Sequence, residues 1–473
     1  MSDASLLPPK LVGDFAVATE ADWRALVAKT LGEAPFQSLE KATVEGLPIA
    51  PLYAPAAAPA IAPRSLDPER PWDLRTLTAH PDAARANSEI LRDLEGGAAS
   101  VIVRIDPTGK GGVAIGSAGG LAQALSGVIL ELAPAALDAG FLGPQAADWL
   151  GVVAKASPNA LLRFNLDPLS AFAEAGASPG PIEAHLISAA TVSARLADIY
   201  PQAQLFLASG RVIHEAGGGE ALEVAFAAAA ALAYAKALVR AGLPMADVFE
   251  RITLGLSADA DYFLTIAKLR AGRAVWSRIA TACGADPAVR IEARSSRRML
   301  TAKDAWTNMI RLTAAGFGAA VGGADAVVLG NFTDALGLPT PFARRQSRNA
   351  QLVLMEEAHI GRVSDPAAGS GYVEALTDQI AREAWTRFQA IEAAGGIVAA
   401  LTSGLIAAEV AAANSARPAA RIIGVTAFPP DKDAPAEIEI AAAKAVAAPS
   451  PRLPGPDSAC PPLSPMRLSE AFE

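Results

Sequence analysis

The chain has 473 residues, of which 52% are hydrophobic and 19% charged, so it can bury one large core or two to three smaller ones. Its formal net charge of −9 and the absence of a basic run exclude nucleic-acid binding as a main role. Two distant cysteines predict neither a disulfide framework nor a zinc site, which favours the cytoplasm, and no apolar run is long enough to predict a membrane span.

Residues 1–70 are predicted to form an arm. The first residues lack the basic and apolar regions of a signal peptide. The stretch "ATEADWRALVAKTL" places apolar residues at helical spacing, and "PLYAPAAAPAIAPR" then follows as a Pro/Ala-rich segment. A helix followed by an extended segment is typical of an arm that lies on another surface.

Residues 71–415 alternate short apolar runs with longer Ala-rich helical stretches. Eight candidate strands are counted at 100–105, 127–132, 160–165, 203–208, 249–254, 289–294, 326–330 and 361–365. A helix-sized gap follows nearly every one. This pattern predicts an α/β fold, a closed parallel (β/α)₈ barrel of the TIM type, with a doubly wound open sheet as the alternative.

Residues 416–473 are predicted to contain one more strand, at 421–429, and a Pro-rich tail. The tail, "APSPRLPGPDSACPPLSPMRLSEAFE", has too little apolar pattern to pack by itself. We expect residues 430–473 to be extended on a surface, without forming a domain, and their amides to exchange readily.

Short motifs predict little chemistry. "GKGGVAIGSAGG" lacks the ending of a Walker loop, and "DPAAGSGY" is equally compatible with an anion-binding turn and a plain connection. His80, His185 and His359 stand on separate segments, so no metal site is predicted.

Longer stretches carry a resemblance to a known family. The runs "DYFLTIAKLRAGRAVWSRI" and "LTAKDAWTNMIRLTAAGFGAAVGGADAVVLGNFTDALGLPTPFARRQSRNAQLVLMEEAHIGRVSDPAAGSGY" resemble the acyl-CoA mutases, whose best-known member is methylmalonyl-CoA mutase. "RPWDLR" and "RLSEAFE" extend the likeness towards both ends. The resemblance implies a barrel that threads coenzyme A along its axis, and adenosylcobalamin held at the barrel mouth by a separate C-terminal domain.

The residues that the family uses for catalysis are replaced in this chain. The family has a Tyr-His pair in "GYHMQEAG", whereas the aligned "GRVIHEAG" places Arg211 at the tyrosine and Val212 at the histidine. A second tyrosine, in "RPWTIRQY", is Leu77 here. No catalytic residue is therefore predicted; His214, two positions beyond the lost histidine, is the one remaining candidate.

Some coenzyme A contacts implied by the resemblance have counterparts in this chain. Arg75 matches the arginine of the family's "TIRQY", and Arg251 and Thr253 match its Arg-x-Ser. No histidine stands in the Asp-x-His-x-x-Gly pattern that ligates cobalt in the family, and the sequence ends where family chains lead into the cobalamin domain. We therefore expect a partner chain, and not this one, to hold adenosylcobalamin.

Three interpretations follow. The first is the non-catalytic small subunit of a heterodimeric methylmalonyl-CoA mutase, paired with a catalytic large subunit that isomerises the acyl-CoA substrate. The second is the catalytic barrel of an isobutyryl-CoA-type mutase that uses a separate cobalamin-binding subunit. The third is an unrelated barrel enzyme using Arg251 and His214 for acid-base chemistry. Since the polar substrate contacts are lost, we expect stacked side chains to plug the barrel axis.

Overall fold

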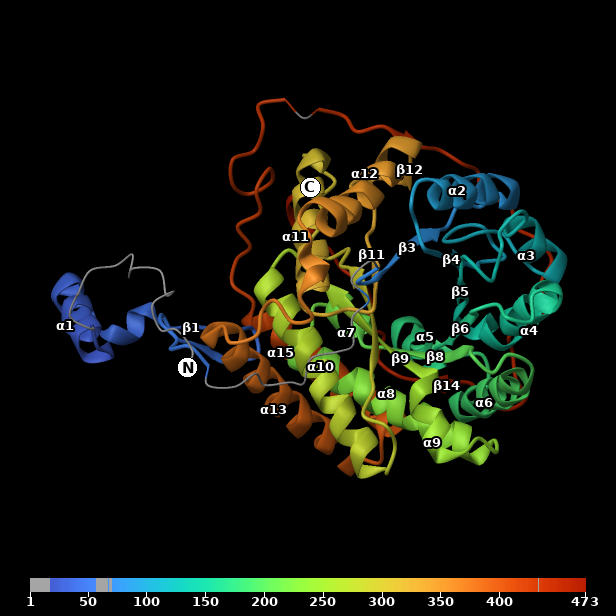
Figure 1. The fold of residues 1–473 in the computed structure, drawn as a ribbon, viewed down its shortest axis with the longest axis horizontal. Helices are drawn as coiled ribbons and strands as arrows, with labels where there is room; N and C mark the ends of the chain where they lie inside the picture. Colours follow the sequence, from blue (N-terminus) through green and yellow to red (C-terminus); the bar gives the residue numbers. More distant parts are fainter. Residues whose placement is uncertain (1–17, 57–66, 68–69, 433) are drawn as a thin grey trace, which may run out of the picture.

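The computed structural model describes residues 18–56, 67, 70–432 and 434–473. Its centre is a closed barrel of eight parallel strands surrounded by helices (Figure 1). Each strand pairs with the next along the chain, and the last pairs with the first, which excludes the open-sheet alternative. The strands are β3 (Asp73–Thr78), β4 (Ser100–Arg104), β5 (Ala135–Asp138), β6 (Arg163–Leu166), β8 (Gln204–Ser209), β9 (Ile252–Ala258), β10 (Arg290–Ser295) and β11 (Ala326–Val328).

Two of the eight predicted strands are wrong, although the barrel and its strand number are confirmed. Residues 127–132 form turns, and residues 361–365 form a bend after a short 3₁₀ turn. Ile129 and Leu132 of the first run are 59% and 72% exposed, whereas Leu130 is buried. The barrel uses β3 and β5 instead. The prediction missed them because four of the six residues of β3 are polar, and because β5 reads Ala-Ala-Leu-Asp, which is too short and alanine-rich for a clear strand pattern.

Helices cover the outside of the barrel between successive strands. They are α2 (Ala83–Glu95), α3 (Ala118–Ala124), α4 (Gly143–Val153), α5 (Pro168–Ala175), α6 (Ile182–Ile199), α7 (Arg211–Glu215), α8 (Glu220–Arg240), α9 (Met245–Val248), α10 (Tyr262–Ala282), α11 (Asn308–Val321), α12 (Pro341–Leu352), α13 (Gly371–Ala393), α14 (Ile397–Thr402) and α15 (Leu405–Ala416). Local capping fixes several starts: the Asp261 side chain accepts from the Leu264 amide at α10, and Thr340 caps α12.

Helix α8 is a long, strongly apolar helix. By length and composition alone it could cross a membrane, but most of its residues are buried. It packs against β8, β9, α10 and α13, so its apolar character on all sides reflects a position inside the protein.

The N-terminal arm contains helix α1 (Glu20–Leu31), which lies far from the barrel (Figure 1). Thr19 and Asp22 form a capping box, but no residue of α1 is buried. The hairpin of β1 (Lys41–Ala42) and β2 (Pro48–Ile49) anchors the arm, because Glu45 in its turn accepts hydrogen bonds from the Ala221 and Leu222 amides at the start of α8. Residues 57–66 of the predicted Pro/Ala-rich segment lie outside the described residues.

The C-terminal tail runs around the barrel as an extended belt, defined here as residues 434–473 (Figure 1). It adds β13 (Ile438–Glu439) to β12 (Leu338–Pro339), and β14 (Ser458–Ala459) to β7 (Ala177–Ser178). The prediction of an extended, surface-lying tail is confirmed. The strand predicted at 421–429 is wrong, because these residues form turns with one isolated bridge.

The belt is held more firmly than an extended tail was expected to be. Its backbone donates hydrogen bonds to loops at the carboxyl ends of the barrel strands, including Val446 to Pro107 and Met466 to Glu215. Leu463 is 3% exposed. The expected ready exchange of its amides therefore conflicts with these hydrogen bonds.

Candidate functional site at the barrel mouth

Two cavities open at the carboxyl ends of the barrel strands, where barrel sites are normally built. One has a volume of about 610 Å³ and the other about 550 Å³. Both are lined by arginines from different strand ends: Arg104 after β4, Arg211 at the start of α7, and Arg294 and Arg297 in and after β10. We refer to this region as the barrel mouth.

The structure brings together the positions where the family's catalytic residues are replaced. Leu77, near the end of β3, and Arg211 line the smaller mouth cavity, and Arg211 and Val212 line the larger one. Leu77 also packs against Ile102 and Val328 inside the barrel. The mouth therefore presents an aliphatic and a cationic side chain at positions where the resemblance implies two tyrosines.

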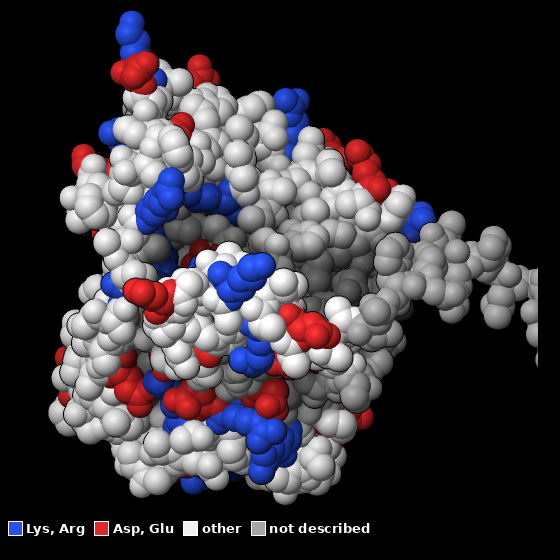
Figure 2. Space-filling view, turned by 90° about the vertical axis from the view of Figure 1, so that its left-hand side faces the viewer, with Lys and Arg blue, Asp and Glu red and all other residues white. Residues whose placement is uncertain are grey.

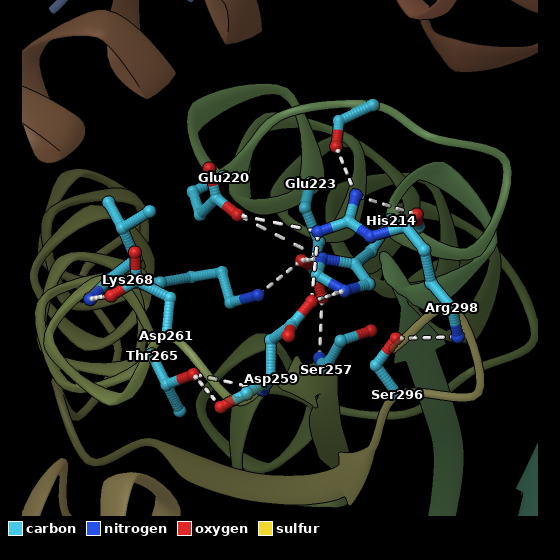
Figure 3. A network of polar contacts seen from close by, with 12 residues as sticks. His214, Glu220, Glu223, Ser257, Asp259, Asp261, Thr265, Lys268, Ser296 and Arg298 are labelled. Carbon is cyan, nitrogen blue, oxygen red and sulfur yellow. Dashed lines mark hydrogen bonds and ion pairs between the residues drawn. The ribbon is translucent and has the colours of Figure 1, made fainter. Parts of the chain in front are cut away.

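His214 does not face the mouth. It lies in α7, is 0% exposed and lines neither cavity. Its Nε2 is 3.0 Å from Asp259 Oδ2, and its Nδ1 is 3.4 Å from Glu223 Oε2 (Figure 3). A histidine so enclosed has no path to a molecule bound at the mouth.

The surroundings of His214 form a closed network of buried charges (Figure 3). Glu223 accepts from Lys268 Nζ at 2.6 Å and from the Ser257 amide at 2.5 Å, while Arg298 lies 3.0 Å from Asp259. Burial opposes the charge of Glu223, but Lys268 and His214 hold the pKa of this carboxyl at about 2. The network joins the end of β8 to α8, α10 and the loop after β9, which is a structural role.

Ion pairs cross the axis of the barrel. Arg294 of β10 lies 2.9 Å from Asp138 of β5, and these strands are four steps apart in a ring of eight, hence on opposite sides. Arg75 of β3 reaches Glu292 of β10 at 2.5 Å. Side chains from opposite strands therefore meet across the axis, as expected, and the side chains that meet there are charged.

The ionised state of this network is maintained by its own pairs. Although burial raises it, the charges of Arg104 and Arg294 hold the pKa of Asp138 well below its usual range. Arg294 and Arg75 likewise hold the pKa of Glu292 at about 2. Both carboxylates stay negative at neutral pH and keep the crossing pairs intact.

The three candidate coenzyme A contacts do not form one site. Arg75 is 1% exposed, and its three nitrogens donate to Ser100, Glu292 and Asp73. Thr253 bonds to Gln204 at 3.3 Å. Of the three, Arg251 alone borders a cavity, one of about 350 Å³ at the opposite end of the barrel.

That opposite cavity contains two further arginines, Arg163 and Arg290. Arg251 precedes β9 and His214 follows β8, so parallel strands place them at opposite ends of the barrel. An acid-base pair of Arg251 and His214 is thereby excluded.

Sequence reasoning missed Asp138 and the mouth arginines. The available signal was positional: "SVIVR", "AALD" and "RIEARS" each end a buried strand on charged residues, and strand ends meet at the barrel mouth. Elsewhere on the surface, acidic and basic side chains are interspersed on the face shown in Figure 2, without the single-sign field that nucleic-acid binding requires.

The fold and the position of the mouth define a barrel of the TIM class, and comparison with known proteins specifies it further. Residues 64–448 match the family model described as methylmalonyl-CoA mutase. The chain belongs to this family.

Relatives of known name span most of the chain. It is 39% identical over 465 residues to the methylmalonyl-CoA mutase small subunit of Streptomyces virginiae, covering 92% of this chain and 74% of that protein. It is 35% identical to the small subunit of Propionibacterium freudenreichii subsp. shermanii, covering 86% and 67%. The methylmalonyl-CoA mutase of Escherichia coli K12 is 29% identical, covering 81% and 60%.

The described histidines do not fit the role of a cobalt ligand at the mouth. His80 borders the smaller mouth cavity, but its Nδ1 accepts from the Asp82 amide and its Nε2 is 3.4 Å from Glu439. His185 and His214 are buried. His359 is exposed but lies near the other end of the barrel, next to Gly361, which packs against Pro71. Among the described residues, no cluster of His, Cys, Asp or Glu could hold a metal ion.

Proposed function

We propose that this chain is the non-catalytic small subunit of a heterodimeric methylmalonyl-CoA mutase. A catalytic large subunit would bind adenosylcobalamin, the family's cofactor, and isomerise (R)-methylmalonyl-CoA and succinyl-CoA in the cytoplasm. Within this chain, residues 1–70 would serve as an arm, 71–415 as a mutase-like barrel and 416–473 as a surrounding tail.

The ion pair between Arg294 and Asp138 carries the proposal. The resemblance implies that coenzyme A passes along the axis of a catalytic barrel, and this pair crosses that path. Moving it aside would separate Arg294, which is 5% exposed, from one of its two carboxylate partners, which burial disfavours. The replaced positions support the same conclusion. Leu77 and Val212 cannot donate the hydrogen bonds that the family's tyrosine and histidine donate there. Arg211 can donate, but it carries a fixed positive charge that the family's tyrosine lacks.

Helix α1 supports a partner. A helix of 12 residues is marginal in water without tertiary packing, and α1 has no buried residue. Leu26 is 66% exposed on it. We infer that α1 gains its packing from the large subunit.

The test is reconstitution of the purified chain with a full-length catalytic mutase chain encoded beside it. We expect co-elution in gel filtration, and turnover by the pair with adenosylcobalamin but none by this chain alone. Turnover by this chain with only a small cobalamin-binding protein added would instead establish the isobutyryl-CoA type of mutase. No association with either partner would refute both interpretations.

A variant pair locates the interface. Leu26→Asp should weaken the heterodimer by at least about tenfold in Kd, because a charge would have to be buried against the partner. Leu132→Asp is the matched control, since Leu132 is similarly exposed at 72% but lies on the barrel. Equal affinities of the two variants would show that α1 is not the contact.

A further inference from the structure

The smaller mouth cavity combines cations with an aliphatic lining. Its walls come from the ends of β3, β10 and β11 and the segment after β4, and Ala441 and Ala443 of the belt border it. The volume of about 550 Å³ is within the usual range for a small-molecule site. Leu77, Val328 and Leu338 contribute the aliphatic surface.

Most of the charges around this cavity are already paired. Arg104 and Arg294 share Asp138. Arg344 pairs with Glu89 and Asp93, and Glu89 also accepts from Thr78. These groups balance one another without a ligand.

The remaining charged residues around the cavity are Asp334, His80 and Lys110, and none of them forms an ion pair with Arg211 or Arg297 among the described residues. Asp334 is held by Asn331; burial raises the pKa of its carboxyl, and the charges of Arg297 and Arg104 offset this rise only in part. His80 faces Glu439, and Lys110 is exposed at the rim.

Two arginines stand apart from these pairs. Within the described part of the chain, the side chains of Arg211 and Arg297 make no ion pair, and Arg211 Nε is buried without a hydrogen-bond partner. Burial and the charge of Arg294 lower the pKa of Arg211, and Glu215 and Asp138 offset this only in part. The Glu215 carboxylate is instead used by the backbone amide of Arg297.

We propose that this cavity binds a small organic dicarboxylate. Guanidinium groups bind carboxylates in a bidentate manner, and two arginines that form no ion pair among the described residues match two carboxylates. The aliphatic lining favours a carbon chain between them over an inorganic anion. This assigns a ligand site to a chain whose proposed role in the complex requires none, and it uses Arg211, which stands where the family has a tyrosine.

The experiment measures binding to the isolated full chain by calorimetry and thermal shift. Glutarate is the dicarboxylate probe, and pentanoate, with the same number of carbons and one carboxylate, is its control. We expect saturable stabilisation by glutarate below roughly 10 mM and at least about tenfold weaker binding of pentanoate. No saturable effect of glutarate, or equal binding of pentanoate or inorganic phosphate, would overturn the proposal.

Variants assign the binding to the two arginines. Arg211→Gln and Arg297→Gln should each weaken glutarate binding about tenfold or more, whereas Arg382→Gln, a change at an exposed arginine paired with Asp378, should not. Without ligand, Arg211→Gln should leave the melting temperature unchanged or raised, because burial opposes this charge. If Arg211→Gln unfolds the chain, the glutarate affinity of Arg297→Gln still tests the site, because Arg297 is exposed and its replacement should leave the fold intact. Unaltered glutarate affinity in Arg297→Gln would refute the site whether or not the chain forms a heterodimer.

Discussion

Replacing Asp138 with asparagine tests the charged axis directly. The Asp138 carboxylate accepts from Arg294 at 2.9 Å and from Arg104 at 3.2 Å. Breaking a buried pair costs about 3–5 kcal/mol because the partner charge stays buried. Arg294 keeps Glu292 at 2.7 Å and Arg104 is partly exposed, so we expect a loss near the lower end, about 3 kcal/mol of unfolding free energy.

Urea denaturation measures this loss, with Asp148→Asn as the control. Asp148 also pairs with an arginine, Arg195, but on the surface, where such a pair contributes about 0–1 kcal/mol. The double variant Asp138→Asn/Arg294→Gln should lose about 2 kcal/mol less unfolding free energy than the sum of the losses of the two single variants. A loss for Asp138→Asn no larger than that of the control would refute the axis-crossing pair.

The pH dependence of the same variant has a defined sign. Because the folded pKa of Asp138 lies below its ordinary value of 3.8, its contribution is complete above that pH and is lost only as the pH falls further. The difference in unfolding free energy between the parent chain and Asp138→Asn should therefore become smaller as the pH falls below 3.8.

Three further predictions follow from buried groups elsewhere. Burial and the charge of Glu220 raise the pKa of Glu45 to about 7. Above about pH 4.5 the folded chain therefore keeps a proton on Glu45 that the unfolded chain has released. Docking of the arm should weaken as the pH rises from about 4.5 to about 7. Hydrogen exchange of the first α8 amides should accelerate accordingly between pH 5 and 8, but not in Glu45→Gln, and a flat profile in the parent chain would contradict this. His214→Leu should cost about 3 kcal/mol by leaving buried carboxylates without their partner, measured by urea denaturation, yet leave turnover of the reconstituted complex at the parent value. The belt amides that donate to the barrel, such as Val446 and Met466, should be protected from exchange in the isolated chain, and exchange at the unprotected rate would show that the belt is not docked.

The fold class could be predicted from the alternation of strands and helices, but the identity of individual strands could not. Strands with one charged face, such as β3, break the apolar run that single-sequence reasoning looks for. The run at 127–132, in which Ile129 and Leu132 are exposed, imitates a strand because hydrophobicity alone does not report burial.

In the candidate site, too, some features could be predicted from the sequence and others could not. The alignment with the family singled out Leu77, Arg211 and Val212, and the structure places all three at the mouth. The pairing of Arg294 with Asp138 did not, because it joins strands four steps apart whose distance in the sequence says nothing about contact. His214 looked like a candidate acid because the three groups that surround it, Glu223, Asp259 and Glu220, come from later segments.

The charged axis also determines what the two ends of the barrel can bind. The cavity beside Arg251 shares no lining residue with either mouth cavity, and the pairs of Arg75 and Arg294 lie between them. A molecule spanning both ends would have to separate Arg294 from Asp138 before gaining any contact, at a cost of about 3–5 kcal/mol. Small ligands confined to one end avoid that cost. The same pairs therefore disfavour a long acyl-CoA along the axis and permit a small anion at the mouth, so the proposed loss of the family reaction and the proposed binding at Arg211 and Arg297 are compatible in one barrel.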